Sequence, residues 1–262
     1  MTAPRAEGSV TLTERDGVAT VLVDRAEKLN ALTPELLDGL HDAVRVVSRG
    51  DSRVVLLRTG GQRAFCVGAD INRFAELSPA AMWSRWTAQG HEVFSAVAAL
   101  PQPTIAVLQG DALGGGFELA LAADFRVASS SVRVGLPEVG LGTVPGWAGT
   151  ERLTALVGPA RAREVVLARR MIDARTAHRW GALTDVVDGA DLETAVARLV
   201  EQLAGGAPMA LRLAKQLLRA AADGVPSRYL EPLAGALSAT SSDLVEGVTA
   251  FRERRPATFK GR

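Results

Sequence analysis

Residues 104–128 decide the fold, and they contain three informative segments: Thr104-Ile-Ala-Val-Leu108, Ala112-Leu-Gly-Gly-Gly-Phe-Glu118 and Phe125-Arg-Val-Ala128. The first and third segments are short apolar runs with β-branched residues, which is typical of strands covered on both faces. A helical stretch at 115–123 lies between them. Strand, helix and strand in succession predict an α/β protein with a parallel sheet.

The residues before this stretch predict further strands and helices. Two alternating runs in residues 10–24 flank Asp16-Gly17, which is a strong signal for a β-hairpin. Thr33-Pro34 is typical of an N-cap with proline at the first helical position, and apolar residues continue at helical spacing through Val47. We then expect a buried strand at 53–58 and helical structure near 79–99.

After about Thr150 the pattern becomes mostly helical. Amphipathic helices are predicted near 150–156, 159–168, 174–180, 191–204 and 208–222. One strand, 183–187, interrupts them, and Gly205-Gly206-Ala-Pro208 is a candidate hinge between two of the helices. The last third is therefore expected to form a helical region.

Composition is typical of a globular protein. The chain has 262 residues, of which 47% are hydrophobic, enough for one domain of about 200 residues with an appended region. A formal net charge of +1 lacks the basic excess that favours nucleic acids or anionic membranes, so we expect neither partner. Cys66 is the only cysteine, which excludes an intrachain disulfide and a cysteine-based metal cluster. Residues 1–8 lack the apolar core of a secretory signal, no segment reaches about 18 uninterrupted apolar residues, and a cytoplasmic location is expected.

Two glutamates lie in apolar, glycine-rich surroundings. Glu118 closes the glycine-rich segment quoted above, and Glu138 lies in Leu136-Pro-Glu-Val-Gly-Leu-Gly-Thr-Val-Pro-Gly146. Burial of an unpaired carboxylate is costly and raises its pKa, so both residues are candidates for general acid–base catalysis. The neighbouring glycines allow backbone N–H groups to approach a ligand.

Each of these features also has a simpler interpretation. Three glycines at 114–116 are by themselves typical of a flexible turn, but the strand before them and Glu118 after them favour a site. Glu138 after Pro137 is also typical of a helix or turn cap. The basic C-terminal segment 249–262 is either a solvated tail or a phosphate site.

Other chemistries have little support in the sequence. His41, His91 and His178 show no metal-ligand spacing, so we expect helix-surface or packing roles for them. Cys66 has no apparent basic partner and is expected to be a small core residue. The glycines of 140–146 lack the spacing of a dinucleotide-binding loop, and neither G-x-x-x-x-G-K-[ST] nor G-x-S-x-G occurs.

Several segments in order resemble the crotonase family of enoyl-CoA hydratases and isomerases. Besides the two glutamate segments they are Asp24-Arg-Ala-Glu-Lys-Leu-Asn-Ala-Leu32, Ala64-Phe-Cys-Val-Gly-Ala-Asp-Ile71, Arg169-Arg-Met-Ile-Asp-Ala-Arg-Thr-Ala-His-Arg-Trp-Gly-Ala-Leu183 and Ala250-Phe-Arg-Glu-Arg-Arg255. The resemblance implies an α/β fold in which a crotonase-like spiral of repeated β-β-α turns is followed by a C-terminal helical trimerisation region. Residues 1–200 would form the spiral core, and residues 201–262 the helical region for oligomerisation and active-site completion.

The resemblance also implies partners and a reaction. Family members with a glutamate at both positions are typically hydratases, which act on an acyl-CoA thioester and assemble as homotrimers or homohexamers. No separate cofactor and no metal are implied, because coenzyme A is carried as part of the substrate. Glu118 is implied to deprotonate the attacking water, and Glu138 to deliver a proton to the α-carbon. Two neighbouring carboxylates are expected to titrate as a coupled pair.

The same resemblance assigns binding residues. The backbone N–H groups of Ala69 and Gly115 are implied to form an oxyanion hole for the thioester oxygen. The positions implied to contact coenzyme A or the acyl group are Lys28, Leu29, Asn30, Ala64, Val67, Ala69, Asp70, Ile71, Gly115, Gly146, Phe251 and Arg254. Phe251 and Arg254 match positions that reach the nucleotide of coenzyme A, commonly in a neighbouring subunit.

Four aromatic residues bear on the acyl pocket. Phe117 and Trp147 replace residues that are usually small in the family, and their bulk is expected to reshape the pocket. Trp83 and Trp86, three apart on a predicted helix, are expected to pack in the core, although the matching family region lines the acyl pocket. Acyl-chain length stays open, with a short chain as the default.

Three alternatives to a hydratase remain. An isomerase of the same family uses a single carboxylate, and the presence of Glu118 argues against it. A catalytically silent acyl-CoA-binding protein is disfavoured because both glutamates and both amide positions are intact. Nucleic-acid binding, known for some family members, is disfavoured by the near-neutral net charge.

Overall fold

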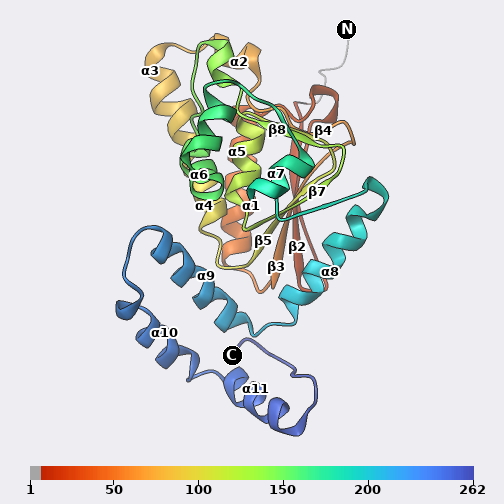
Figure 1. Ribbon diagram of the computed structural model, residues 1–262, viewed down its shortest axis with the longest axis vertical. Helices are drawn as coiled ribbons and strands as arrows, with labels where there is room; N and C mark the ends of the chain where they lie inside the picture. The colour runs from red at the N-terminus through yellow and green to blue at the C-terminus, as the bar shows by residue number, and fades with distance from the viewer. Residues whose placement is uncertain (1–6) are drawn as a thin grey trace.

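The computed structural model describes residues 7–262, so residues 1–6 of the segment considered for a secretory signal lie outside it. Figure 1 shows a core of strands and helices, with the last long helices gathered at one end. Within the described residues, no helix combines the length and the apolar character needed to span a membrane.

The chain begins with the predicted hairpin and helix. β1 (Ser9–Arg15) and β2 (Val18–Asp24) pair antiparallel, and Asp16 and Gly17 both have positive φ, as a tight hairpin turn requires. α1 (Pro34–Ser48) follows, and the Thr33 hydroxyl accepts a hydrogen bond from the backbone N–H of Leu36. The hairpin, the cap and the helix are confirmed.

A six-stranded sheet has the order β1-β2-β3-β5-β7-β10, and every pair after the hairpin is parallel. Its further strands are β3 (Val54–Thr59), β5 (Thr104–Leu108), β7 (Phe125–Ser129) and β10 (Asp185–Val187). In β5, Ala106 and Leu108 pack into the main core, whereas Ile105 and Val107 pack on the opposite face against α8 (Leu192–Ala204). The prediction that this strand is covered on both faces is confirmed.

A second sheet of four short strands is a feature that the sequence pattern does not reveal. Its order is β4 (Ala64–Cys66), β6 (Asp111–Leu113), β8 (Arg133–Gly135) and β9 (Ile172–Asp173). Strands of two or three residues are too short to show an alternating pattern. The chain passes from β3 to β4, from β5 to β6 and from β7 to β8, each time followed by helical structure. These repeated β-β-α turns form the expected spiral (Figure 1).

The longer helices of the core match the predicted stretches. They are α4 (Ala88–Ala98), α5 (Gly115–Ala122), α6 (Gly149–Val166) and α7 (Ala174–Trp180), with α3 (Pro79–Ala81) and η2 (Met82–Thr87) before α4. Short helices that the sequence pattern did not predict are η1 (Ala26–Lys28), α2 (Ile71–Ala75), η3 (Glu138–Leu141) and η4 (Gly189–Asp191). The stretch predicted at 79–99 contains a π-helical segment, η2. The helices predicted at 150–156 and 159–168 are joined in α6, where the backbone of Gly158 is non-helical (φ 80°, ψ 162°).

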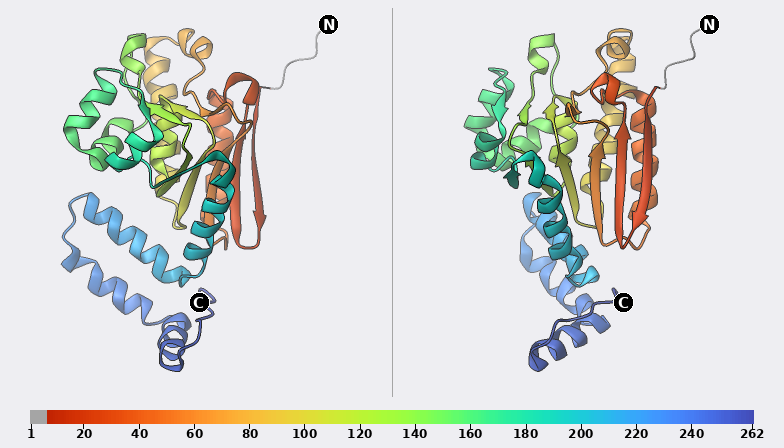
Figure 2. Two further views of the ribbon diagram at one scale, coloured as in Figure 1. Left: turned by 45° about the vertical axis from the view of Figure 1, so that its right-hand side comes forward. Right: turned by 90° about the vertical axis from the view of Figure 1, so that its right-hand side faces the viewer.

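Three longer helices form the C-terminal region. They are α9 (Pro208–Ala222), α10 (Glu231–Ser238) and α11 (Ser242–Glu253), and η5 (Ser227–Tyr229) joins the first two. Figure 2 shows these helices standing apart from the sheet core, beyond the predicted hinge after α8. The predicted domain boundary after residue 200 falls inside α8 and stays a prediction.

Candidate active site

Glu118 lies in the first turn of α5, and the residue is 2% exposed. The helix begins at Gly115 because Gly114 has φ 52° and ψ −133°, a backbone conformation that side chains disfavour. All eight residues of α5 are buried, and the helix packs against α4, α6, β4 and β6. A buried helix therefore fixes the carboxylate at the end of the glycine-rich segment.

Two backbone N–H groups hold the Glu118 carboxylate. Its Oε1 accepts hydrogen bonds of 2.8 Å from Trp147 and from Gly149. Ala148 between them has a left-handed backbone (φ 68°), so these N–H groups converge on one anion as in a backbone nest. Burial raises the pKa of Glu118, and these hydrogen bonds oppose the rise. Sequence reasoning missed both donors, because they lie 29 and 31 residues away in a loop without a local signature.

Glu138 is the first residue of η3 and reaches the same region from a different loop. Both of its carboxylate oxygens are buried, and neither has a hydrogen-bond partner among residues 7–262. Burial, with a contribution from the charge of Glu118, raises the pKa of Glu138 from 4.5 to about 7. Glu138 begins a short helix after Pro137, as the cap interpretation expected, but its carboxylate accepts no hydrogen bond within residues 7–262. The two glutamates are thus electrostatic neighbours with unlike surroundings.

The two predicted amide donors belong to segments that touch. Hydrogen bonds of 2.7 and 2.9 Å join Leu32 to the residues before and after Ala69, so the N–H of Ala69 points away from Leu32. Gly115 begins α5, and its N–H therefore has no acceptor within the helix. Neither N–H donates a hydrogen bond within the described part of the chain. A Cβ on Gly68 would lie 2.9 Å from the amide nitrogen of Gly115, which shows how closely the two segments approach.

The Trp147 side chain fills the space beside Gly115. The residue is 3% exposed, and a Cβ on Gly115 would lie 2.3 Å from a carbon of its ring. A Cβ on Gly90 of α4 would lie 2.2 Å from its Nε1. The ring contacts those of Trp86 and Phe94, with centroids 5.2 and 5.1 Å away, and its Nε1 donates to the Trp86 carbonyl at 3.3 Å. The bulk of Trp147 therefore lies directly against a predicted oxyanion residue.

The other aromatic residues differ in exposure. Phe117 is fully buried and Trp86 is 5% exposed, so both belong to the core. Trp83 is 79% exposed, and the expectation that it packs in the core is wrong. Both tryptophans lie in η2, and a π-helix has more residues per turn than an α-helix. Residues three apart therefore do not share a face there.

The residues implied to bind coenzyme A come largely from two segments joined by hydrogen bonds. The Val67 N–H donates to the Leu29 carbonyl at 3.2 Å. The buried Asn30 side chain donates to the Ala64 carbonyl at 3.1 Å. These bonds bring together residues that are separated by more than thirty positions, as the resemblance implies.

Charged and exposed residues border the same two segments. Lys28 and Ile71 are exposed, Ile71 at 57%. Asp70 is engaged within the chain, because its carboxylate accepts a hydrogen bond of 2.7 Å from Arg25 and one of 3.0 Å from the Asn72 N–H. Asp70 thus organises this edge through its side chain.

The remaining implied binding residues are dispersed. Gly146 precedes the residues that hold Glu118, and a Cβ there would lie 3.4 Å from the Thr87 side chain. Phe251 is 85% exposed in α11, and Arg254 ends that helix with φ 55°. Figure 1 places α11 at the end of the molecule opposite to α2 and β4, so a single chain does not bring Phe251 and Arg254 to the glutamates.

Cysteine and histidine residues take the positions expected of them. Cys66 is buried, and burial raises the pKa of its thiol to about 12. His41, His91 and His178 lie in α1, α4 and α7. Within residues 7–262, no group of three or more His, Cys, Asp or Glu side chains is arranged to hold a metal ion.

Comparisons with known proteins cover almost the whole chain. Residues 13–262 match the family model described as enoyl-CoA hydratase/isomerase. A crotonyl-CoA hydratase of Syntrophomonas wolfei is 36% identical over 258 residues, which are 96% of this chain and 97% of the relative. A short-chain-enoyl-CoA hydratase of Clostridium acetobutylicum is 33% identical over 254 residues, covering 95% of this chain and 97% of that relative.

The fold also matches solved structures. The crystal structure of an enoyl-CoA hydratase from Bacillus anthracis superimposes with a TM-score of 0.92 at 33% identity, covering 97% of this chain and all of that chain. The family resemblance and the spiral fold predicted from the motifs are confirmed by these matches.

Proposed function

Since the chain belongs to the enoyl-CoA hydratase/isomerase family, we propose that it is an enoyl-CoA hydratase, which adds water across the trans-2 double bond of an enoyl-CoA to give a 3-hydroxyacyl-CoA. The observation that carries this proposal is the unlike pair of carboxylates. Glu118 is bound by two N–H groups that favour its anion, whereas the Glu138 carboxylate has no hydrogen-bond donor among residues 7–262 and favours its proton. Hydration needs a base for water and an acid for carbon, and this pair supplies both.

In the proposed reaction, Glu118 removes a proton from water while the water oxygen bonds to C3 of the substrate. The π electrons between C2 and C3 move toward the thioester oxygen to form an enolate. Glu138 then donates its proton to C2. Protonated Glu118 later transfers its proton to Glu138, directly or through water, and both residues return to their starting states. A pKa of about 7 supports this role of Glu138, because the carboxyl is then largely protonated below neutral pH and about half protonated at neutral pH.

The N–H groups of Ala69 and Gly115, which donate no hydrogen bond within residues 7–262, support stabilisation of the enolate oxygen. Donors fixed in advance at a developing negative charge typically lower a barrier by about 3 kcal/mol each. The Gly115 N–H lies at the positive end of the α5 dipole, which favours the same charge.

We also propose a short acyl group on the coenzyme A thioester, without a separate cofactor. Trp147 supports this proposal, because its large buried ring lies directly against Gly115, a residue proposed to bind the thioester. Two of the relatives are named for crotonyl-CoA and for short-chain enoyl-CoA.

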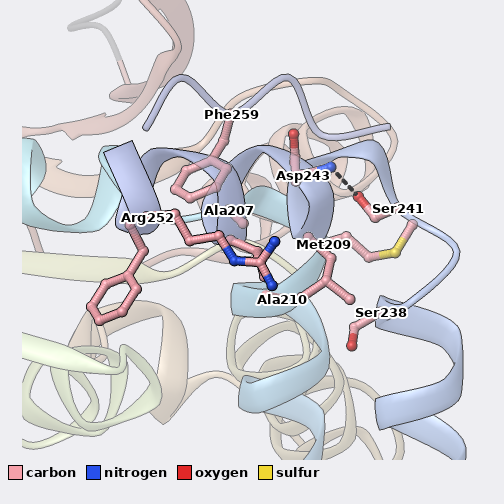
Figure 3. A pocket seen from close by; sticks show the side chains of 12 residues that line it. Ala207, Met209, Ala210, Ser238, Ser241, Asp243, Arg252 and Phe259 are labelled. Carbon is pink, nitrogen blue, oxygen red and sulfur yellow. Dashed lines mark hydrogen bonds between the residues drawn. The ribbon is translucent and has the colours of Figure 1, made fainter. Parts of the chain in front are cut away.

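A homotrimer, alone or paired into a hexamer, is part of the proposal. The C-terminal helices expose large apolar side chains at Leu218, Tyr229, Leu233, Leu237, Val245 and Phe251. A groove of about 440 Å³ lies between α9, α11 and the C-terminal tail, and Figure 3 shows Met209 and Ala210 in it beside Arg252 and Phe259. Such surfaces support contact with another copy, in which Phe251 and Arg254 would complete a neighbouring coenzyme A site.

The experiment that tests the function follows the absorbance of the conjugated enoyl thioester. Crotonyl-CoA and a longer 2-enoyl-CoA are compared for the wild type, Glu118→Gln and Glu138→Gln. Each substitution is expected to lower kcat by about a thousandfold or more. A 3-enoyl-CoA serves as the substrate that an isomerase would use.

The outcomes separate the alternatives. Rapid loss of the crotonyl-CoA absorbance that depends on both glutamates would support the hydratase. Turnover of the 3-enoyl-CoA alone would indicate an isomerase, and binding of acyl-CoA without turnover of either substrate would indicate a silent binding protein. Either of these last results would overturn the proposal.

A further inference from the structure

Arg152 lies in α6, one turn after the loop that holds Glu118. Its half-buried guanidinium donates to the Trp147 carbonyl at 2.9 Å and to the Phe94 carbonyl at 3.4 Å. It forms no ion pair with a carboxylate among residues 7–262. Because burial of an unpaired charge is costly, an arginine held by two carbonyl oxygens requires an explanation.

Arg152 contacts both peptide groups of the strained loop residue. Its side chain binds the Trp147 carbonyl, which precedes Ala148, and its backbone N–H donates to the Ala148 carbonyl at 3.0 Å. Ala148 has φ 68°, a conformation that a non-glycine residue keeps only when its surroundings enforce it. The same conformation directs the N–H groups of Trp147 and Gly149 toward Glu118. The Arg152 side chain thus binds the peptide that precedes Ala148, whereas its backbone bond to Ala148 is the first hydrogen bond of α6.

The charge of Arg152 acts on the same carboxylate. It favours the ionised form of Glu118, while burial favours the neutral form. The other ionisable groups around Arg152 and Glu118 come from several elements. They are Glu138 from η3, Glu151 from α6, His91 from α4, Lys215 and Arg219 from α9, Asp223 after α9, and Asp124 before β7. Among these groups, Arg152 is the cation whose charge lowers the pKa of Glu118.

We propose that Arg152 is a positioning residue of the active site, which holds the peptide between Trp147 and Ala148 so that two N–H groups converge on Glu118 and keeps Glu118 ionised beside Glu138. The inference rests on the proposed hydratase function, in which Glu118 must be ionised to accept a proton from water. It adds to that function a residue that acts through the loop holding Glu118 and through its own charge.

The test compares Arg152→Gln, Arg152→Lys and the control Arg163→Gln, which removes an exposed positive charge from the same helix. Hydration of crotonyl-CoA is measured from about pH 5 to about pH 9. Arg152→Gln is expected to lower kcat by roughly a hundredfold with little change in KM, because Glu118 is displaced. It is also expected to move the acidic limb of the kcat profile upward by on the order of one pH unit.

Lysine at position 152 separates geometry from charge. Arg152→Lys keeps the charge but not the planar fork, so we expect a lower kcat with the acidic limb near its wild-type position. Arg163→Gln is expected to leave both quantities unchanged. An acidic limb unmoved in Arg152→Gln would overturn the proposal even if kcat fell, because a purely structural loss does not change the ionisation of Glu118.

Two further results have defined meanings. If Arg152→Gln does not fold, Arg152→Met replaces it, and failure of both neutral variants to fold would assign Arg152 to folding and overturn the proposal. If the wild type shows no hydration, the proposed function fails. Ionisation of Glu118, followed by carboxylate infrared absorption with Glu118→Gln as reference, would then still show whether Arg152 controls it.

Discussion

The regions around Glu118 and Glu138 place the same type of side chain in different hydrogen-bonding surroundings. Glu118 stands on a fully buried helix, and two N–H groups from a strained loop bind its carboxylate. Glu138 begins a short turn whose Leu141 is 62% exposed, and its buried oxygens have no partner within residues 7–262. The difference teaches that hydrogen-bond donors, more than burial, distinguish the proposed base from the proposed acid.

Apart from replacing a glutamate itself, the largest effect is expected from disturbing the loop that binds Glu118. In Gly149→Ala, the new Cβ would lie 2.5 Å from Glu118 Cγ and 2.7 Å from Oε1, so the carboxylate must move and lose its donors. We expect kcat for crotonyl-CoA to fall by about a hundredfold to a thousandfold. Gly235→Ala is the control, because a Cβ there meets open space in α10, and its kcat should not change. A Gly149→Ala enzyme of normal kcat would show that Glu118 needs no fixed position.

The next effect concerns the proton of Glu138. Because its pKa is about 7 and the proposed donor must be protonated, wild-type kcat is expected to fall with rising pH above about 7, by about tenfold per pH unit. Steady-state measurements of kcat for hydration across the pH range test this decrease. A rate that stays constant to about pH 9 would contradict Glu138 as the donor.

Stability should distinguish the two glutamates as well. The folded protein binds the Glu138 proton more tightly than the unfolded chain does, so stability present below about pH 4.5 is lost as the pH rises through about 7. Allowing for partial exposure, the free energy of unfolding of Glu138→Gln at pH 8, measured by urea unfolding, should exceed that of the wild type by roughly 1–3 kcal/mol. Glu118→Gln should gain less, since two donors already stabilise that anion. An equal increase in the free energy of unfolding of the two variants would contradict the proposed difference between the two regions.

The smallest effect is expected from a side chain whose backbone does the binding. Trp147→Phe keeps the N–H that binds Glu118 but loses the Nε1 hydrogen bond to Trp86 and part of the ring volume. Stability should fall by about 1–2 kcal/mol and kcat by less than about tenfold. Thermal unfolding and hydration assays measure both quantities. A loss of kcat as large as that of Gly149→Ala would show that the ring itself orients the carboxylate.

Local signals made much of the fold predictable. The hairpin has its turn residues at Asp16-Gly17, α1 has its cap at Thr33, and β5 has its apolar run, each within a few neighbouring residues. The second sheet was missed because its strands are too short for a period, and Trp83 was misplaced because a π-helical segment changes the helical period.

The candidate site was predictable only in part. Glu118 and Glu138 were recognisable as carboxylates in apolar, glycine-rich segments. Their contrast was not, because it depends on donors from Trp147 and Gly149 that the spiral brings from a distant loop. Arg152 has no local signature either, since its partners are backbone carbonyls whose positions depend on the tertiary fold.

The placement of Trp147 between Gly90 and Gly115 couples three positions that are far apart in the sequence. A Cβ at Gly90 or at Gly115 would lie within 2.3 Å of the Trp147 ring, so the tryptophan fits in this position only while both residues lack a side chain. Alanine at position 90 or 115 therefore requires a smaller residue at position 147. Substitutions at these three positions are consequently expected to be non-additive, and a double change can be tolerated where a single change is not.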